Sequence, residues 1–258
     1  MNSMNQKLKA FEELLHIMDK LRDKCPWDKK QTLESLRNLT IEETYELADA
    51  ILDDDLEEIK KELGDLLLHV VFYSKIGSEK NSFDIADVMK SISDKLVFRH
   101  PHVFGEVKVN SADEVVENWE ELKRKEGHRS VLAGVPKSLP SMIKANRVQE
   151  KARAVGFDWD KRDQVWDKVK EELLELETEI ENNDADKIES EFGDLLFSVI
   201  NAARLYNIDP ETALEKTNRK FINRFMILED ETLHKGRELK DMSLSEMNEI
   251  WELAKDKE

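Results

Sequence analysis

The sequence predicts an all-α protein made of two tandem helical-bundle domains, and three observations lead to that prediction. Apolar residues recur at helical spacing along almost all of the 258 residues, and no segment alternates convincingly as a strand does. The chain has only eight glycines and five prolines, a composition that favours helix over strand. One acidic pattern occurs twice, 129 positions apart, which indicates two related halves.

In the first half, the apolar spacing predicts helices over residues 5–22, 32–52, 56–77, 82–98 and 111–126. The acidic run 53–55 ends the second of these helices and caps the third. The segment 99–105 is predicted to be a loop, because Pro101 and Gly105 interrupt the helical pattern.

The second half repeats the same order after a linker. Residues 127–140 contain two glycines and two prolines, which is typical of a connection between domains. Helices are predicted over 141–154, 161–182, 185–206, 210–233 and 244–257. We therefore expect a first domain at 1–126, the linker at 127–140 and a second domain at 141–258.

Composition excludes several functional classes. The formal net charge of −17 repels nucleic acid on average, so we expect no nucleic-acid partner. Cys25 is the only cysteine, so no internal disulfide is expected. The N-terminal residues lack the apolar stretch of a signal peptide, and the most apolar run is too short to span a bilayer. A cytoplasmic protein without membrane contact is expected.

The repeated acidic pattern reads EExxE on one helix and ExxD on the next. Residues three or four apart share one face of a helix, and the short connection predicts that the two helices pack antiparallel. The acidic faces of each pair then converge. The ten carboxylates of the two copies are Glu42, Glu43, Glu46, Glu62, Asp65, Glu171, Glu172, Glu175, Glu191 and Asp194.

Converging carboxylates repel one another, and a hard cation relieves that repulsion. We therefore predict that at least one of the two copies binds a metal ion, Mg²⁺ with Mn²⁺ as a possible substitute. The alternative is that these glutamates form ordinary solvated faces. The ExxD acids argue against it, because they lie within apolar runs where an unpaired carboxylate is costly. Gly64 and Gly193, directly before the two aspartates, suggest close packing there.

A basic pair and two tryptophans also recur in each half. Lys95 and Arg99 match Lys220 and Arg224 at a shift of 125, and each pair shares a helix face that can meet phosphate oxygens. The tryptophan matches, at a shift of 132, are Trp27 with Trp159 and Trp119 with Trp251. Trp119 and Trp251 either stack on a nucleobase or close the helical core, whereas Trp27 and Trp159 are expected to have core or helix-packing roles.

These motifs resemble the MazG family of all-α nucleoside triphosphate pyrophosphohydrolases. The resemblance covers nearly the whole chain. The sequence motifs that carry this resemblance are CPWDKKQT, TIEETYELADAI, ELGDLLLHVVFY, SDKLVFRHPHVFGE, VGFDWD, EFGDLLFSVINAAR and NRKFINRF. The tandem halves are themselves a trait of that family.

The resemblance implies hydrolysis of nucleoside and deoxynucleoside triphosphates to the monophosphate and pyrophosphate, with Mg²⁺ and broad base tolerance. It also implies a homodimer that clears aberrant or excess nucleotides. On this sequence it makes the ten carboxylates the metal ligands. Lys220, Arg224 and Trp251 become substrate contacts, together with Asn218 beside the basic pair and the counterparts Lys95, Arg99 and Trp119.

The catalytic base stays open at this point, because the sequence offers Glu172 or Glu175 in the second half and Glu43 or Glu46 in the first. We expect the C-terminal half to be the more active. Two other classes compete with this reading. One is a non-catalytic helical binding module with a structural metal, and the other is a phosphohydrolase for a non-nucleotide phosphate.

Overall fold

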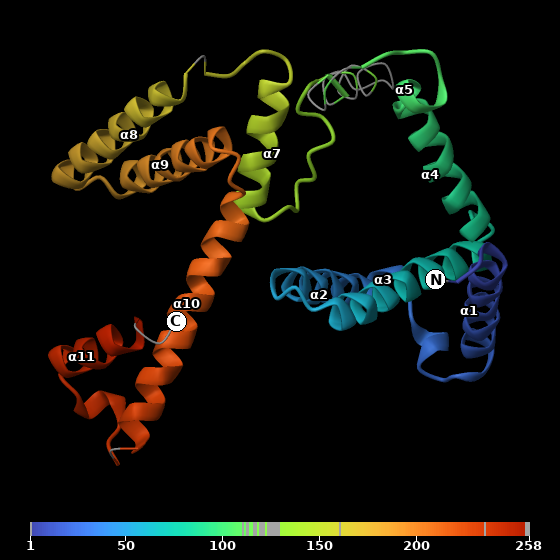
Figure 1. Ribbon diagram of the computed structural model, residues 1–258, viewed down its shortest axis with the longest axis horizontal. Helices are drawn as coiled ribbons and strands as arrows, with labels where there is room; N and C mark the ends of the chain where they lie inside the picture. Colours follow the sequence, from blue (N-terminus) through green and yellow to red (C-terminus); the bar gives the residue numbers. More distant parts are fainter. Residues whose placement is uncertain are drawn as a thin grey trace. The chain divides into compact units, whose positions relative to one another are not determined.

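The computed structural model describes residues 2–109, 111, 114–115, 118, 122, 130–159, 161–234 and 236–255. Every regular element within these ranges is a helix, which confirms the all-α prediction (Figure 1). The chain divides into a first unit, Met1–Lys108, and a second unit, Val109–Glu258. Most of the helix predicted over 111–126, including Trp119, lies outside the described residues. None of the described helices is long and apolar enough to cross a bilayer.

Apart from α5 (Pro101–Phe104), the observed helices begin and end within three residues of the predicted ones. The first unit contains α1 (Met4–Lys24), α2 (Leu33–Leu52), α3 (Leu56–Glu79), α4 (Ile85–Arg99) and α5. The second unit contains α7 (Ser141–Arg153), α8 (Arg162–Asn182), α9 (Ala185–Leu205), α10 (Pro210–His234) and α11 (Leu244–Lys255).

The short helix α5 corrects one prediction. It occupies the segment that was expected to be a loop, and Pro101 stands at its first position. A proline is tolerated there because the first N–H groups of a helix have no partner within the helix.

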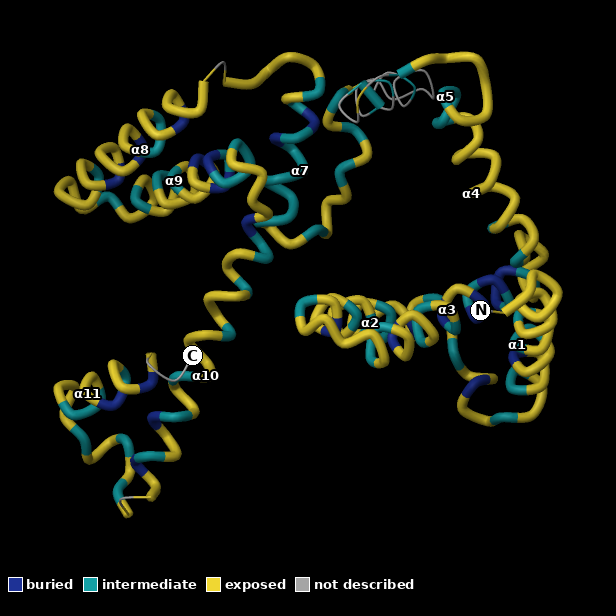
Figure 2. Tube along the Cα trace, viewed as in Figure 1, coloured by how far each residue is buried: buried dark blue, intermediate teal, exposed yellow. Residues whose placement is uncertain are grey.

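The first unit has a compact apolar core where α1 meets the C-terminal end of α3. Buried residues concentrate at that place in Figure 2. The core cluster consists of Met18, Leu36, Val71, Phe72 and Ile76. Since α2 and α3 pack along each other, this core fixes how the acidic faces of the two helices meet.

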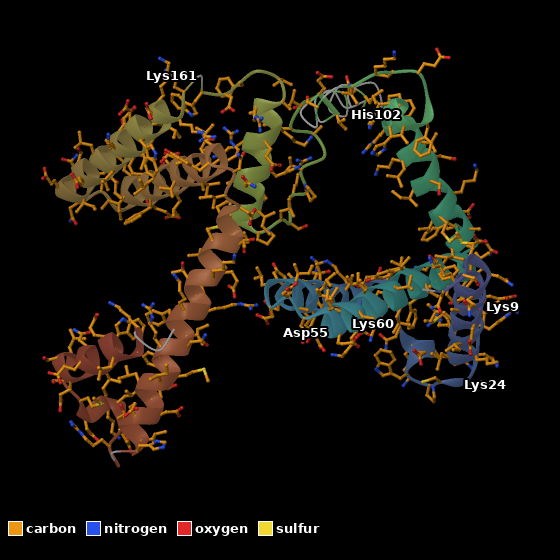
Figure 3. The ribbon with its side chains drawn as sticks, in the orientation of Figure 1. Lys9, Lys24, Asp55, Lys60, His102 and Lys161 are labelled. Carbon is orange, nitrogen blue, oxygen red and sulfur yellow. The ribbon has the colours of Figure 1, made fainter. Side chains whose placement is uncertain are left out.

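The turn between the two acidic helices has the same backbone geometry in both units. Asp54 and Asn183, which are 129 positions apart, both adopt the left-handed conformation, with φ of 54° and 56°. Asn and Asp tolerate this region better than most residues. The next residue then caps the following helix: Asp55, labelled in Figure 3, accepts hydrogen bonds from the backbone N–H groups of Glu57 and Glu58. The repeat seen in the sequence is thus also a repeat of backbone structure.

The close packing expected at Gly64 and Gly193 is not found, nor are the core positions considered for Trp27 and Trp159. A Cβ atom built on Gly64 or Gly193 would meet nothing within 4 Å, so neither glycine marks a close approach. Trp27 is 56% exposed and does not belong to the core. Trp159 is 38% exposed and lines a cavity instead, as described below.

Candidate active site

The structure brings six of the ten predicted carboxylates into two clusters of three. We call Glu43, Glu46 and Glu62 the first acidic cluster, and Glu172, Glu175 and Glu191 the second acidic cluster. In each cluster one carboxylate oxygen per residue lies within 4.8 Å of the others. Two members come from the EExxE helix and one from the ExxD helix, as the antiparallel pairing requires.

The other four predicted ligands lie at the edges of these clusters. The charge of Asp65 acts on Glu43, that of Glu42 on Glu46, and that of Asp194 on Glu191. Glu171 forms an ion pair with Lys168 at 2.9 Å.

A lysine ammonium accompanies each cluster. Lys61 lies 3.0 Å from the buried carboxylate of Glu62, and Lys168 lies 2.7 Å from that of Glu172. The hydrogen bond to Glu172, followed by that to Glu171, raises the pKa of Lys168. Each lysine therefore stays charged and offsets part of the negative charge of its cluster.

The carboxylates in each cluster repel one another, and this repulsion contributes to a raised pKa in both clusters. Burial, and then the charges of Glu175 and Asp194, raises the pKa of Glu191. Burial, and then the charges of Asp65 and Glu46, raises the pKa of Glu43. A second cation near either cluster would relieve this repulsion.

The residues present fit a hard divalent cation. Carboxylate oxygens are the ligands that Mg²⁺ and Mn²⁺ prefer. In addition, Oε2 of Glu62 is buried without a hydrogen-bond partner among the described residues, although Oε1 accepts from Lys61. A buried carboxylate oxygen left in that state is costly, and a metal ion would satisfy it.

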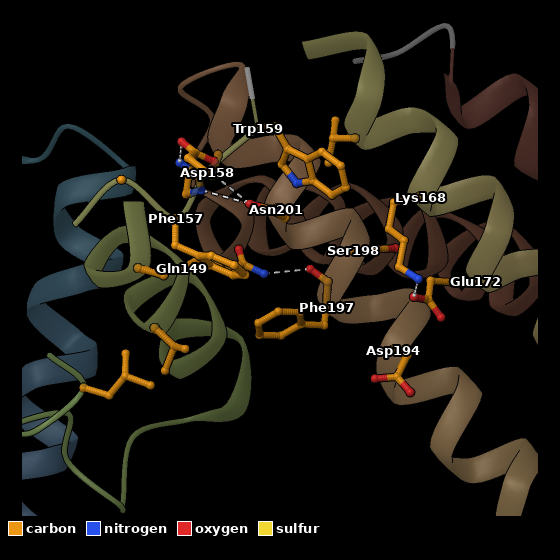
Figure 4. A pocket seen from close by; sticks show the side chains of 16 residues that line it. Gln149, Phe157, Asp158, Trp159, Lys168, Glu172, Asp194, Phe197, Ser198 and Asn201 are labelled. Atoms are coloured by element: carbon orange, nitrogen blue, oxygen red, sulfur yellow. Dashed lines mark hydrogen bonds and ion pairs between the residues drawn. The ribbon is translucent and has the colours of Figure 1, made fainter. Parts of the chain in front are cut away.

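A cavity of about 630 Å³ adjoins the second acidic cluster (Figure 4). Glu172, Asp194 and Lys168 form part of its wall, and most of the remaining wall is apolar or aromatic. Such a volume suits a small-molecule ligand the size of a nucleoside.

The end of α7 and the loop after it close this cavity on one side. The N–H of Gly156 donates to the carbonyl of Arg153, and that of Phe157 donates to Ala152. This is a Schellman-type helix end, which needs the positive φ of 84° at Gly156. The turn directs Phe157 and Trp159 to the cavity.

Two positions of this cavity correspond to larger side chains in the first unit. At a shift of 129, Ser198 and Asn201 of the cavity correspond to His69 and Phe72. His69 and Phe72 are both buried, and Phe72 belongs to the core of the first unit. The two halves thus share their acidic clusters but differ in the space beside them.

Comparison with known proteins identifies the family to which the chain belongs. The family model of the MazG nucleotide pyrophosphohydrolase domain matches residues 31–104 and 162–226, which include all ten predicted ligands. The chain belongs to the MazG family. The "nucleoside triphosphate pyrophosphohydrolase/pyrophosphatase MazG" of Thermotoga maritima is 43% identical over 95% of both chains. The "nucleoside triphosphate pyrophosphohydrolase" of Escherichia coli K12 is 41% identical over 99% of both.

The substrate contacts expected from the MazG resemblance in the second half lie outside the cavity. Trp251 packs at the junction of α10 and α11, with its ring 5.0 Å from that of Phe221 and 5.8 Å from the guanidinium of Arg224. Asn218 donates to Glu215 on the same helix, and Lys220 is exposed. The roles of these residues in binding substrate stay predictions.

The same holds for the basic pair of the first half. Lys95 and Arg99 lie in α4, where Lys95 borders a shallow cavity with Phe83 and Asp87. Trp119 lies outside the described residues.

Sequence reasoning missed several cavity residues. Lys168 had a signal, because it precedes Glu171 and Glu172 by three and four positions on one helix face. Asp158, Asn201 and Arg204 lie within the motifs VGFDWD and EFGDLLFSVINAAR that carry the family resemblance, but nothing in those motifs indicates a shared cavity. Gln149 had no signal in the sequence.

Proposed function

We propose that this protein hydrolyses nucleoside and deoxynucleoside triphosphates to the monophosphate and pyrophosphate with Mg²⁺, and that the second unit carries the reaction. The observation that carries this proposal is the cavity beside the second acidic cluster. One wall of it offers carboxylates for a metal-bound triphosphate, and the rest offers aromatic surface for a nucleoside. The names of the family and of both relatives support the same reaction.

The metal would be held by Glu172, Glu175 and Glu191, with Glu171 and Asp194 at the edge of the set. When bound, Mg²⁺ would polarise the phosphoanhydride and offset the charge of the leaving pyrophosphate. In the first unit Glu43, Glu46 and Glu62, with Glu42 and Asp65, would hold a metal in the same way.

The chain's own groups supply the remaining chemistry. Of the two candidate bases, Glu175 is the more exposed and has the freer oxygens, because Glu172 accepts a hydrogen bond from Lys168. We therefore favour Glu175 for taking a proton from the attacking water. Lys168, on the cavity wall, would stabilise charge that develops on the phosphate oxygens.

We further propose a homodimer with broad base tolerance that clears aberrant or excess nucleotides. Support for the dimer comes from α10, where four large apolar side chains are 38–57% exposed: Phe221, Ile222, Phe225 and Met226. Contiguous apolar surface of this kind marks contacts between proteins. Light scattering of the purified chain would give twice its mass if the dimer exists, and the single mass otherwise.

Pyrophosphate release from a panel of ribo- and deoxyribonucleoside triphosphates tests the reaction. Release of pyrophosphate and monophosphate with Mg²⁺, abolished by EDTA, is the expected result. Orthophosphate and diphosphate as products would contradict the cleaved bond that we propose. Turnover of non-nucleotide phosphates alone would favour the general phosphohydrolase, and no turnover at all would favour the binding module.

A further inference from the structure

Gln149 in α7 is a buried side chain whose amide is only half satisfied. The residue is 6% exposed, and its Nε2 donates to the backbone carbonyl of Phe197 at 2.8 Å. Its Oε1 is buried and has no hydrogen-bond partner among the described residues. Because a carbonyl oxygen accepts only, the amide nitrogen must face Phe197, and this fixes the free oxygen on the other side.

Gln149 lines the cavity, at the end away from the carboxylates (Figure 4). Figure 4 shows Gln149 and Phe157 on one side of the cavity, and Lys168, Glu172 and Asp194 on the other. A triphosphate held at the acidic side therefore directs its nucleoside toward Gln149. Trp159, between the two sides in the same view, offers an aromatic face along the way.

A buried acceptor without a partner is costly, and an arriving N–H donor removes that cost. The four common nucleobases differ in shape and in most of their hydrogen-bonding groups. Each of them nevertheless carries at least one N–H donor on the ring or on an amino group. A single free acceptor beside apolar and aromatic walls therefore accepts all four bases.

We propose that Oε1 of Gln149 accepts a hydrogen bond from an N–H group of the nucleobase of the bound triphosphate. The proposal rests on the proposed function and adds to it a specificity-determining residue. One acceptor then explains tolerance of every common base. The same acceptor discriminates against a base without any N–H, because such a base leaves Oε1 unpaired.

Purine riboside triphosphate, which is ATP without its amino group, separates these cases. It keeps the triphosphate, the sugar and the purine ring, and it has no N–H on the base. For the natural chain with Mg²⁺, we expect kcat/KM for ATP to exceed that for purine riboside triphosphate roughly ten- to a hundredfold. This comparison needs no variant, so it does not depend on the folding of one.

The variant Gln149→Leu then assigns the difference to this residue. Leucine keeps a similar volume without an acceptor, so the preference for ATP should fall to about twofold or less. Gln164→Leu is the matched control, because Gln164 accepts from the backbone of Lys161 at the start of α8 and does not line the cavity. That control should keep the full preference for ATP, and thermal unfolding of both variants reports on their folding.

The outcomes distinguish this inference from the proposed function. A preference for ATP that disappears in Gln149→Leu and persists in Gln164→Leu supports the inference. Equal turnover of both nucleotides by the natural chain, or a preference that survives in Gln149→Leu, overturns the inference and leaves the proposed reaction standing. No turnover of any triphosphate overturns the proposed reaction, and the inference falls with it.

Discussion

Arg204 in α9 holds Asp158, in the loop before α8, by hydrogen bonds to both oxygens of its carboxylate. Nη1 donates to Oδ2 at 3.0 Å, and Nη2 donates to Oδ1. Burial on its own would raise the pKa of Asp158, but the hydrogen bonds from Arg204 and from the backbone N–H of Trp159, together with the charges of Arg204 and Arg153, lower it. This pair ties the loop that contains Phe157 and Trp159 to α9, which also lines the cavity.

The replacement Arg204→Ala should therefore release the loop that lines the cavity from α9. Its side chain is 8% exposed, and losing hydrogen bonds to a charged group costs about 1.5–3 kcal/mol of stability. We expect KM for ATP to rise several-fold with a smaller change in kcat, measured beside urea unfolding. Arg153→Ala is the control, since its Nε lies 3.9 Å from Asp158, beyond hydrogen-bond distance. Equal effects of the two substitutions would contradict the role of the Arg204 pair.

Replacement Lys168→Met should tighten metal binding while it weakens catalysis. The ammonium of Lys168 competes with a metal ion for Glu172, so its removal should lower Kd for Mn²⁺ several-fold in calorimetric titration. Loss of its charge beside the phosphates should lower kcat. Lys170→Met serves as the control, because Lys170 pairs at 3.5 Å with the exposed Asp167 on the same helix. An unchanged Kd in Lys168→Met would exclude the competition.

The stabilising effect of Mg²⁺ should grow as pH rises. The pKa of Glu191 in the fold lies above its ordinary value of 4.5. Its contribution to stability is thus fully present below the unfolded pKa and is lost as pH rises through the folded pKa. Ionisation also creates the metal ligand, so protons and metal compete.

We therefore expect Mg²⁺ to raise the Tm more at pH 7.5 than at pH 5, as measured by differential scanning calorimetry. Glu191→Gln should reduce this difference between the two pH values. Glu189→Gln, at an exposed position of the same helix, should leave it unchanged. An equal rise in Tm at both pH values would show that protons do not compete with the metal.

Paired substitutions should assign the reaction to one unit. Glu172→Gln with Asp194→Asn removes ligands beside the cavity and should lower kcat/KM for ATP by about a hundredfold or more. Glu43→Gln with Asp65→Asn changes the matching positions of the first unit, where the larger, buried His69 and Phe72 stand at the positions of Ser198 and Asn201, and should change kcat/KM by about twofold or less. Full activity in the first double variant would assign catalysis to the first unit.

The helices and the acidic clusters could be predicted from the sequence because both depend on local periodicity. The spacing of Glu172, Glu175 and Glu191 puts them on facing sides of a helix pair whose connection is too short for any other arrangement. Their convergence follows from the chain alone, and the family match supports it.

The cavity could not be predicted in this way. Gln149, Asp158 and Arg204 are far apart in the sequence and carry no periodic signal, since their proximity depends on how α7 packs against α9. The tryptophans were misjudged for a related reason. Trp27 and Trp159 recur at one shift, but recurrence of a residue type does not say whether it faces a core, a cavity or solvent.

The left-handed turns at Asp54 and Asn183 set the rotational phase of one acidic helix against the other. One inserted residue there would rotate the second helix by about 100° and carry Glu62 or Glu191 off the shared face. The two halves have changed length on either side, since their offset is 132 at Trp27 and 125 at Lys95, yet it is 129 for every carboxylate. The chain length on either side of each turn has thus changed between the two halves. The spacing of sixteen residues that spans the turn, from the EExxE motif to the ExxD motif, is the same in both copies.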